Sequence, residues 1–100
     1  MRIDRLAGNV LEWAEDRGIF MESTPEDQAI KTLEELSELF KALSNNDKEG
    51  TIDAYGDVLV TLIVGMELAG TCTGDCLDHA WKEIRDRKGK MVNGLFVKDE

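Results

Sequence analysis

The sequence predicts an all-α fold: a four-helix bundle with a short C-terminal hairpin or tail, completed by oligomerisation. Apolar residues recur at three- and four-residue spacing over most of the 100 residues, and helix-capping signals flank these segments. One segment, residues 52–69, is apolar on nearly every side, which requires burial all round. The length fits a single domain, residues 1–100.

The first two predicted helices carry clear periodicity and end signals. The first runs from Ile3 to about Arg17, and Gly18 follows where a helix would stop. The second begins after Thr24, a good N-cap residue, with Pro25 at the first helical position. It ends at residues 44–47, and its apolar stripe consists of Ala29, Leu33, Leu36, Phe40 and Leu43.

The third segment, Ile52 to Ala69, is ambiguous from its pattern, because the run 58–64 is rich in β-branched residues and fits a buried strand. Its length without turn residues favours a helix, buried all round with the help of a second subunit. A fourth helix is predicted from Thr73 or Gly74 to near Gly89. In residues 91–97 an Asn-Gly pair stands between two short apolar runs. This pattern indicates a hairpin, but one that is too short to be stable alone.

The charge distribution excludes some partners. The formal charge is −9, with a pI near 4.5, which argues against nucleic acid and anionic membranes as partners. Residues 1–81 hold seventeen acids and six bases, whereas residues 82–100 hold four acids and six bases. No secretory signal opens the chain, and the longest apolar stretch, 58–70, is short for a membrane span and contains Glu67. Two cysteines make no disulfide framework, so a cytoplasmic protein is expected.

Acidic residues gather on two of the predicted helices. Glu34, Glu35 and Glu38 share one side of the second helix, and Asp57 is the only charge between Asp53 and Glu67 on the apolar third helix. A solvated acidic face is the simpler interpretation of the glutamates alone. If the two helices pack antiparallel through their stripes, however, Glu35, Glu38, Asp53 and Asp57 converge. Carboxylates so placed suit Mg²⁺ or Mn²⁺.

This pair of motifs resembles the MazG-like nucleoside triphosphate pyrophosphohydrolases, in particular the short proteins of bacteriophages and their hosts. The resemblance covers most of the chain: residues 13–18, Gln28 and Lys31, the Glu-Glu-x-x-Glu of residues 34–38, the segment 55–60 that begins Tyr-Gly-Asp, and the ending 83–98. It implies an all-α, Mg²⁺-dependent enzyme that cleaves (d)NTPs to the monophosphate and pyrophosphate. It also implies a homodimer or homotetramer in the cytoplasm of a bacterium or a phage-infected host.

The resemblance assigns roles to individual residues. Glu35, Glu38 and Asp57 match the family's metal ligands, but the family's second motif is Glu-x-x-Asp and Ala54 stands where its glutamate would be. Asp53 is then the candidate substitute. The other candidates are Glu34 as the base that activates water, the phosphate-binding cations Lys31, Arg87 and Lys90, and Trp13, either a core residue or a stacking partner for a nucleobase.

Two other hypotheses remain open from the sequence. The chain could be a noncatalytic helical dimerisation or adaptor module derived from the same fold, weakened as an enzyme at Ala54. Cys72, Cys76 and His79 have zinc-like spacing, but a closed structural site lacks its fourth ligand.

Overall fold

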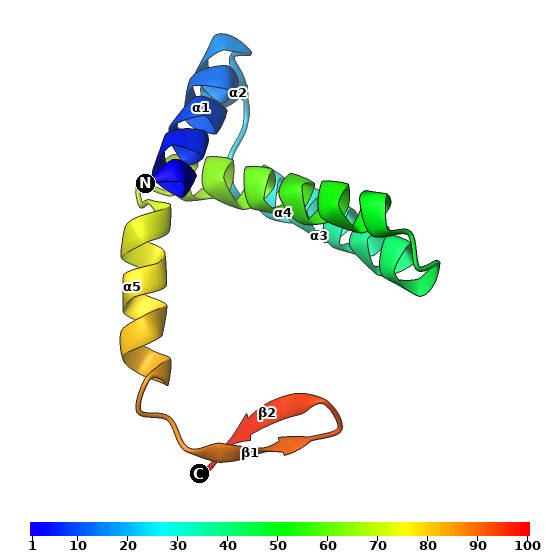
Figure 1. The fold of residues 1–100 in the computed structure, drawn as a ribbon. Coiled ribbons are helices and arrows are strands. Elements are labelled where there is room, and N and C mark those ends of the chain that lie inside the picture. Colours follow the sequence, from blue (N-terminus) through cyan, green and yellow to red (C-terminus); the bar gives the residue numbers. More distant parts are fainter.

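The computed structural model describes residues 1–100 as five helices and one small sheet (Figure 1). The predicted all-α fold with a C-terminal hairpin is confirmed. The short second helix was not predicted, because four residues are too few to show a helical period. The elements are α1 (Arg2–Asp16), α2 (Ile19–Glu22), α3 (Pro25–Ser44), α4 (Lys48–Leu68), α5 (Thr73–Ile84), β1 (Gly89–Val92) and β2 (Leu95–Lys98).

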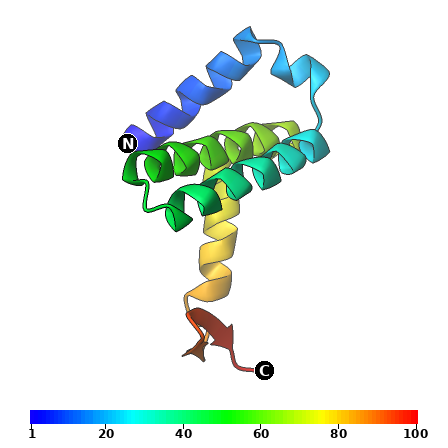
Figure 2. The ribbon, with the colours of Figure 1, turned by 90° about the vertical axis from the view of Figure 1, so that its right-hand side faces the viewer.

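The centre of the fold is the antiparallel pair of α3 and α4, which lie side by side along their length (Figures 1 and 2). A capping box starts α3, as expected: the Asp27 amide donates to Thr24 Oγ1 at 3.0 Å and the Thr24 amide donates to Asp27 Oδ2 at 3.2 Å. Helix α4 begins four residues earlier than predicted. Asp47, read from the sequence as part of the preceding turn, also caps α4, because its Oδ1 accepts from the Gly50 amide at 2.9 Å.

Helix α3 does not contact α4 through the stripe predicted from the sequence. The contact row is one residue earlier at each turn, and Leu39 in this row is 8% exposed, whereas Leu33 and Phe40 of the predicted stripe are 68% and 71% exposed. The hydroxyl groups of Thr32 and Thr61 lie 2.8 Å apart across the helix pair. The contact row consists of Gln28, Thr32, Glu35, Leu39 and Ala42, at the 4-3-4-3 spacing of a packed helix.

The interior of the single chain is small. Helix α1 packs against the second half of α4, so α4 is covered on two sides. Tyr55, Leu59 and Leu62 on the uncovered side of α4 are exposed in the single chain. The burial of this helix by a second subunit stays a prediction. The buried residues are Ala14, Leu39, Ala54, Val58, Thr61 and Val64.

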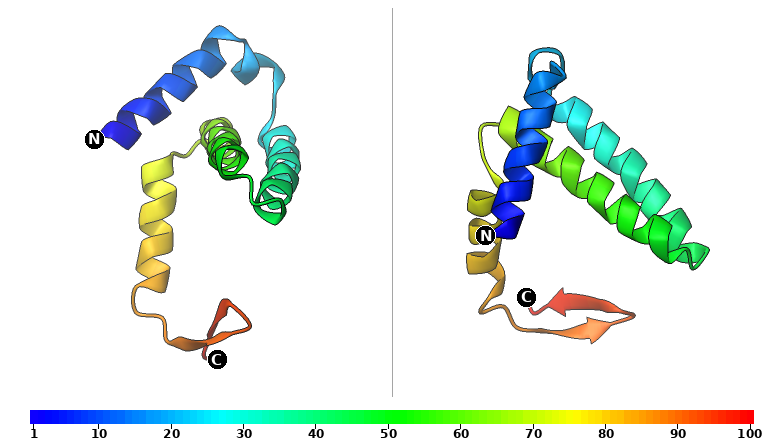
Figure 3. Two further views of the ribbon diagram at one scale, coloured as in Figure 1. Left: turned by 45° about the vertical axis from the view of Figure 1, so that its right-hand side comes forward. Right: turned by 45° about the horizontal axis from the view of Figure 1, so that its top comes forward.

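Residues 73–98 form an arm, here called the C-terminal arm, that projects from the helical body. Helix α5 leaves the end of α4 in a new direction, away from the α3–α4 pair, and the strands turn back beneath that pair (Figures 1, 2 and 3). Asn93 and Gly94 have φ angles of 50° and 85°, the left-handed values that a two-residue hairpin turn requires. Helix α5 ends at Ile84, before the predicted end near Gly89, because Gly89 already pairs with Lys98 in the sheet.

The arm makes the molecule extended. Every residue from 74 to 100 is exposed, and neither α5 nor the strands pack closely against α1, α3 or α4. The radius of gyration is 15.8 Å, against about 13 Å for a compact 100-residue domain. None of the helices combines the length and the apolar character that a membrane crossing requires.

Candidate metal and nucleotide site

Four carboxylates singled out in the sequence line one pocket of about 280 Å³ between α3 and α4. Glu35 and Glu38 lie one turn apart on α3, and Asp53 and Asp57 lie one turn apart on α4. Because the helices run antiparallel and share a short connection, the second half of α3 lies opposite the first half of α4. We call this space the carboxylate pocket; its other lining residues are Lys41, Ala42, Asn45, Asp47, Gly50 and Ala54.

The carboxylate pocket carries more negative than positive charge. Glu38 lies 3.7 Å from the Lys41 ammonium, and Glu35 lies 3.6 Å from that of Lys31. Asp53 and Asp57 take part in no ion pair. Two of the four carboxylates are therefore uncompensated in a shared pocket, an arrangement that favours the binding of a cation.

Lys31 also pairs with Glu34 at 3.2 Å. The hydrogen bond and the charge of Glu34, with smaller contributions from Glu35, raise the pKa of Lys31 above its ordinary value. Lys31 therefore remains a cation throughout the physiological pH range and can meet an anionic ligand in the charged form.

The donor set of the carboxylate pocket fits a hard divalent cation in its chemistry. All four side chains offer oxygen atoms, and they stand on two helices that are packed along their length. No three acidic or other metal-ligating side chains in the structure lie close enough together to share one metal ion. The carboxylates therefore line the same pocket, but in this structure their oxygen atoms do not converge on one metal position.

Ala54 occupies the ligand position that departs from the MazG-like pattern. Ala54 lines the carboxylate pocket and is 6% exposed, at the contact with α3. Asp53, the neighbouring residue, lines the same pocket from the adjoining position on α4. A carboxylate is thus absent at residue 54 itself and present one residue before it.

A second pocket of about 490 Å³ adjoins the first and shares Glu35 and Asp57 with it. Trp13 of α1 lines it and is half exposed, and the Arg17 guanidinium lies 5.8 Å from the centre of the Trp13 ring. We call this space the mixed pocket, because it combines apolar and polar groups. Its other lining residues are Ile19, Asp27, Gln28, Lys31, Val60, Thr61 and Val64.

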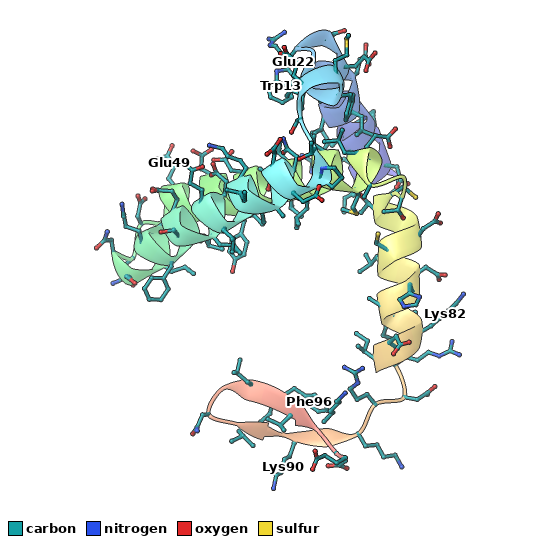
Figure 4. The ribbon with its side chains drawn as sticks, turned by 180° about the vertical axis from the view of Figure 1, so that it is seen from behind. Trp13, Glu22, Glu49, Lys82, Lys90 and Phe96 are labelled. Atoms are coloured by element: carbon teal, nitrogen blue, oxygen red, sulfur yellow. The ribbon has the colours of Figure 1, made fainter.

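Three residues assigned from the sequence lie outside both pockets. Glu34 is an exposed residue of α3 whose recorded partner is Lys31. Arg87 and Lys90 belong to the C-terminal arm, away from the α3–α4 pair of the same chain (Figure 4 labels Lys90).

Sequence reasoning missed other residues that line the pockets. Asp47 lines the carboxylate pocket, and Asp27, Gln28 and Thr61 line the mixed pocket. Thr61 could have been noticed as the one hydroxyl in the apolar run 58–64. The other three have no local signal that separates a pocket residue from a surface residue.

Comparison with known proteins gives one family and one relative. The model of the phosphoribosyl-ATP pyrophosphohydrolase family matches residues 14–88, which include the carboxylate pocket, the mixed pocket apart from Trp13, and α5. Over 62 residues the chain is 36% identical to an uncharacterized 18.2 kDa protein in the rep-hol intergenic region of Haemophilus phage HP1. This match covers 62% of the chain but 38% of the phage protein, so the chain spans less than two-fifths of that relative. No solved structure matches the chain.

Proposed function

Because this chain belongs to the phosphoribosyl-ATP pyrophosphohydrolase family, which is related to the MazG-like all-α pyrophosphohydrolases, we propose that it hydrolyses the α–β phosphoanhydride bond of nucleotides. The products are the monophosphate and pyrophosphate. Nucleoside and deoxynucleoside triphosphates are the proposed substrates, in line with the short phage-type MazG-like proteins that the sequence resembles. Phosphoribosyl-ATP, after which the family is named, is the second substrate to test.

The observation that carries the proposal is the contact between the two pockets. The carboxylate pocket offers oxygen ligands and unpaired negative charge, and the mixed pocket offers an aromatic ring, apolar walls and Lys31. They share Glu35 and Asp57, so one elongated ligand can occupy both. A nucleotide has this form, with a flat base at one end and a charged phosphate chain at the other.

In this proposal Glu35, Glu38 and Asp57, with Asp53 in place of the missing ligand at residue 54, hold Mg²⁺ or Mn²⁺. A divalent cation bound there supplies the positive charge that lets phosphates enter an acidic pocket and polarises their phosphorus–oxygen bonds. The half-exposed Trp13 ring in the mixed pocket offers a face for stacking on a nucleobase.

The proposed chemistry also needs a proton acceptor and cations for the phosphate oxygens. Glu34 is the proposed base for the attacking water, and its link to Lys31 places a carboxylate and a cation at the edge of the mixed pocket. Lys31 is the proposed cation within the chain. Arg87 and Lys90 are the proposed cations of the C-terminal arm, which contributes no residue to the carboxylate pocket or the mixed pocket of its own chain.

The proposed partners are small-molecule nucleotides and further copies of the chain, with neither nucleic acid nor membranes. The first experiment incubates the purified protein with each common NTP and dNTP and with phosphoribosyl-ATP, in the presence of Mg²⁺ or Mn²⁺. Ion-exchange chromatography separates the products. Glu38→Ala removes one pocket carboxylate, and Glu22→Ala is the matched control on α2, outside both pockets.

The products distinguish the hypotheses. Monophosphate and pyrophosphate from the wild type and Glu22→Ala, with at least a hundredfold loss in Glu38→Ala, would support the proposal. Diphosphate and orthophosphate would mean that the bond assignment is wrong. Absence of turnover with both metals would favour the noncatalytic adaptor module, for which Ala54 in the carboxylate pocket is the relevant departure.

A further inference from the structure

The single chain exposes much more surface than a globular protein of its size. Its accessible surface is 8104 Å², whereas a compact protein of 11.2 kDa exposes about 5,700 Å². The excess is about 2,400 Å² per chain, or about 4,800 Å² for two chains, which is the size of an obligate homodimer interface. Covering this surface with a second copy is therefore enough to restore the surface of a compact protein.

Several of the large exposed apolar side chains lie on one face of the α3–α4 pair. On each helix, an exposed apolar row follows the internal contact row by one residue, or 100° around the axis. Because the helices are antiparallel, these two rotations point to the same side of the pair. We call this side the apolar face; its large exposed residues are Leu33, Leu36, Phe40 and Leu43 on α3 and Tyr55, Leu59 and Leu62 on α4.

The carboxylate pocket opens on the opposite side. Glu38, Asp53 and Asp57 each precede a contact-row residue by one position, which is the reverse rotation. Figure 4 shows Glu49, one turn before Asp53, on the side of the pair that faces away from the strands. The apolar face is therefore directed toward the C-terminal arm, which does not pack closely against α3 or α4.

The length of α5 fits one intervening layer. Helix α5 has twelve residues and is therefore about 18 Å long. The axes of packed helices lie about 8–10 Å apart, so two such steps cover about the length of α5. One helix pair from another chain can thus lie between the α3–α4 pair and the strands, with its apolar face against that of the first chain.

The charges of the arm complement the far side of such a layer. Four cations of the arm take part in no ion pair: Arg87, Lys88, Lys90 and Lys98. In the carboxylate pocket, Asp53 and Asp57 are unpaired too. A second copy whose apolar face meets that of the first directs its carboxylate pocket toward these cations. A two-fold axis that lies between the two apolar faces and runs across the helices makes α4 antiparallel to its copy. In that arrangement an arm that starts at the end of one α4 reaches the beginning of the other, where the pocket lies.

We propose that the C-terminal arm of each copy clasps the α3–α4 pair of a second copy and brings Arg87 and Lys90 to the partner's carboxylate pocket. The clasp covers the apolar face and supplies the site with cations that its own chain does not bring there. The role of these cations in binding phosphate rests on the proposed function, whereas the clasp itself does not.

Light scattering during size-exclusion chromatography tests the clasp without any substrate. The wild type should have a mass of at least twice 11.2 kDa. Phe40→Glu on the apolar face and Leu95→Glu on the arm, each 71% exposed in the single chain, should raise the dimer dissociation constant about 30-fold or more. Met21→Glu, 91% exposed on α2, is the matched control and should leave the mass unchanged. Circular dichroism verifies that each variant keeps its helices.

A wild type of 11.2 kDa would overturn the proposal, and so would folded Phe40→Glu and Leu95→Glu proteins that assemble as Met21→Glu does. The position of the arm is tested with two full-length chains, Lys41→Cys and Lys90→Cys, both carrying Cys72→Ser and Cys76→Ser. A short bismaleimide should link the mixture into heterodimers. Links that form equally well from a Met21→Cys chain in place of Lys41→Cys would contradict the proposed position.

Subunit mixing tests the shared site. Glu38→Ala and Arg87→Ala should each be inactive alone, and an equimolar mixture that exchanges subunits should recover about a quarter of the wild-type activity, because half of the dimers then contain one intact site of two. A mixture that stays inactive, or a fully active Arg87→Ala protein, would overturn the shared site. A wild type that turns over no nucleotide would contradict the proposed function, while the mass and cross-linking results would still decide the clasp.

Discussion

The carboxylate pocket can be tested most directly at Ala54, with Ala54→Glu and the matched control Ala54→Gln. Ala54 is 6% exposed and lines the pocket beside Asp53 and Asp57. Glutamate at this position adds a sixth carboxylate to a pocket that already has Glu35, Glu38, Asp47, Asp53 and Asp57, whereas glutamine has nearly the same size and no charge. The difference between the two variants therefore isolates the effect of the charge from the effect of the larger side chain.

The size of the effect follows from the charges already present. Glu35 and Glu38 each have a lysine partner, so the unpaired Asp53 and Asp57 dominate the repulsion. Two like charges about 8 Å apart repel by about 2 kcal/mol at an effective dielectric constant of 20. Without metal we therefore expect Ala54→Glu to be about 2–3 kcal/mol less stable than Ala54→Gln, which lowers Tm by about 10–20 °C in a domain of this size.

Magnesium should reduce this difference between the two variants. The added carboxylate is a ligand at the position where the MazG-like pattern has one, and saturation to 100 times Kd stabilises the folded state by about 2.7 kcal/mol. Thermal unfolding, followed by circular dichroism in EDTA and in MgCl₂, measures both effects. Equal Tm values for the two variants in EDTA, together with an equal rise in Mg²⁺, would refute the reasoning that a cation-binding carboxylate cluster surrounds residue 54.

Three further predictions concern the body of the chain. Thr24→Ala removes the capping box with Asp27 and should cost about 1 kcal/mol, measured by urea unfolding; an unchanged midpoint would contradict the role of the cap. Thr61→Val removes the buried hydroxyl that bonds across the α3–α4 pair and should also cost about 1 kcal/mol, with the helix content unchanged. Glu34→Gln should lower the pKa of Lys31, seen in a nitrogen NMR titration, because Glu34 raises it most. Since the pKa is raised in the fold, the attraction to Glu34 should persist below pH 10.5 and fade only as pH rises through the folded pKa; a titration unchanged by the substitution would contradict this.

Local chemistry was sufficient to predict most of the fold. Thr24 and Pro25 mark the start of α3, and the Asn93-Gly94 pair supplies the left-handed turn of the hairpin. These signals are local because a cap or a two-residue turn involves only neighbouring backbone groups. Asp47 was misread for the same reason: one residue both follows α3 and caps α4, so the local pattern gives two valid boundaries.

The choice of contact row could not be predicted from the helix pattern alone. Helix α3 carries two rows at 4-3-4-3 spacing, one residue apart, and the row that is richer in large apolar residues is the exposed one. Thr32 and Leu39 contact α4 instead, and the hydroxyl of Thr32 is matched by that of Thr61. Only the partner helix decides between two such rows, because both satisfy the same period.

The site was predictable to the extent that it lies on one helix pair. Spacing on each helix placed Glu35 with Glu38 and Asp53 with Asp57, and an antiparallel hairpin placed the two pairs around one pocket. The mixed pocket needs Trp13 from α1, whose position depends on how α1 packs against α4. A helix pattern contains no information about that crossing, so the aromatic wall could be suspected from residue type but not located.

The carboxylates of the proposed site and the apolar residues of the proposed interface lie on different sides of the α3–α4 pair. Residues one position before the internal contact row include Glu38, Asp53 and Asp57, and residues one position after it include Phe40 and Leu59. Because these positions are about 160° apart around each helix axis, a substitution in one set does not touch the other. If the arm clasps a second copy, the two functions nevertheless meet again, since breaking the apolar face also withdraws the partner's cations from the pocket. Phe40→Glu should then lose both dimerisation and turnover, although Phe40 lines neither pocket.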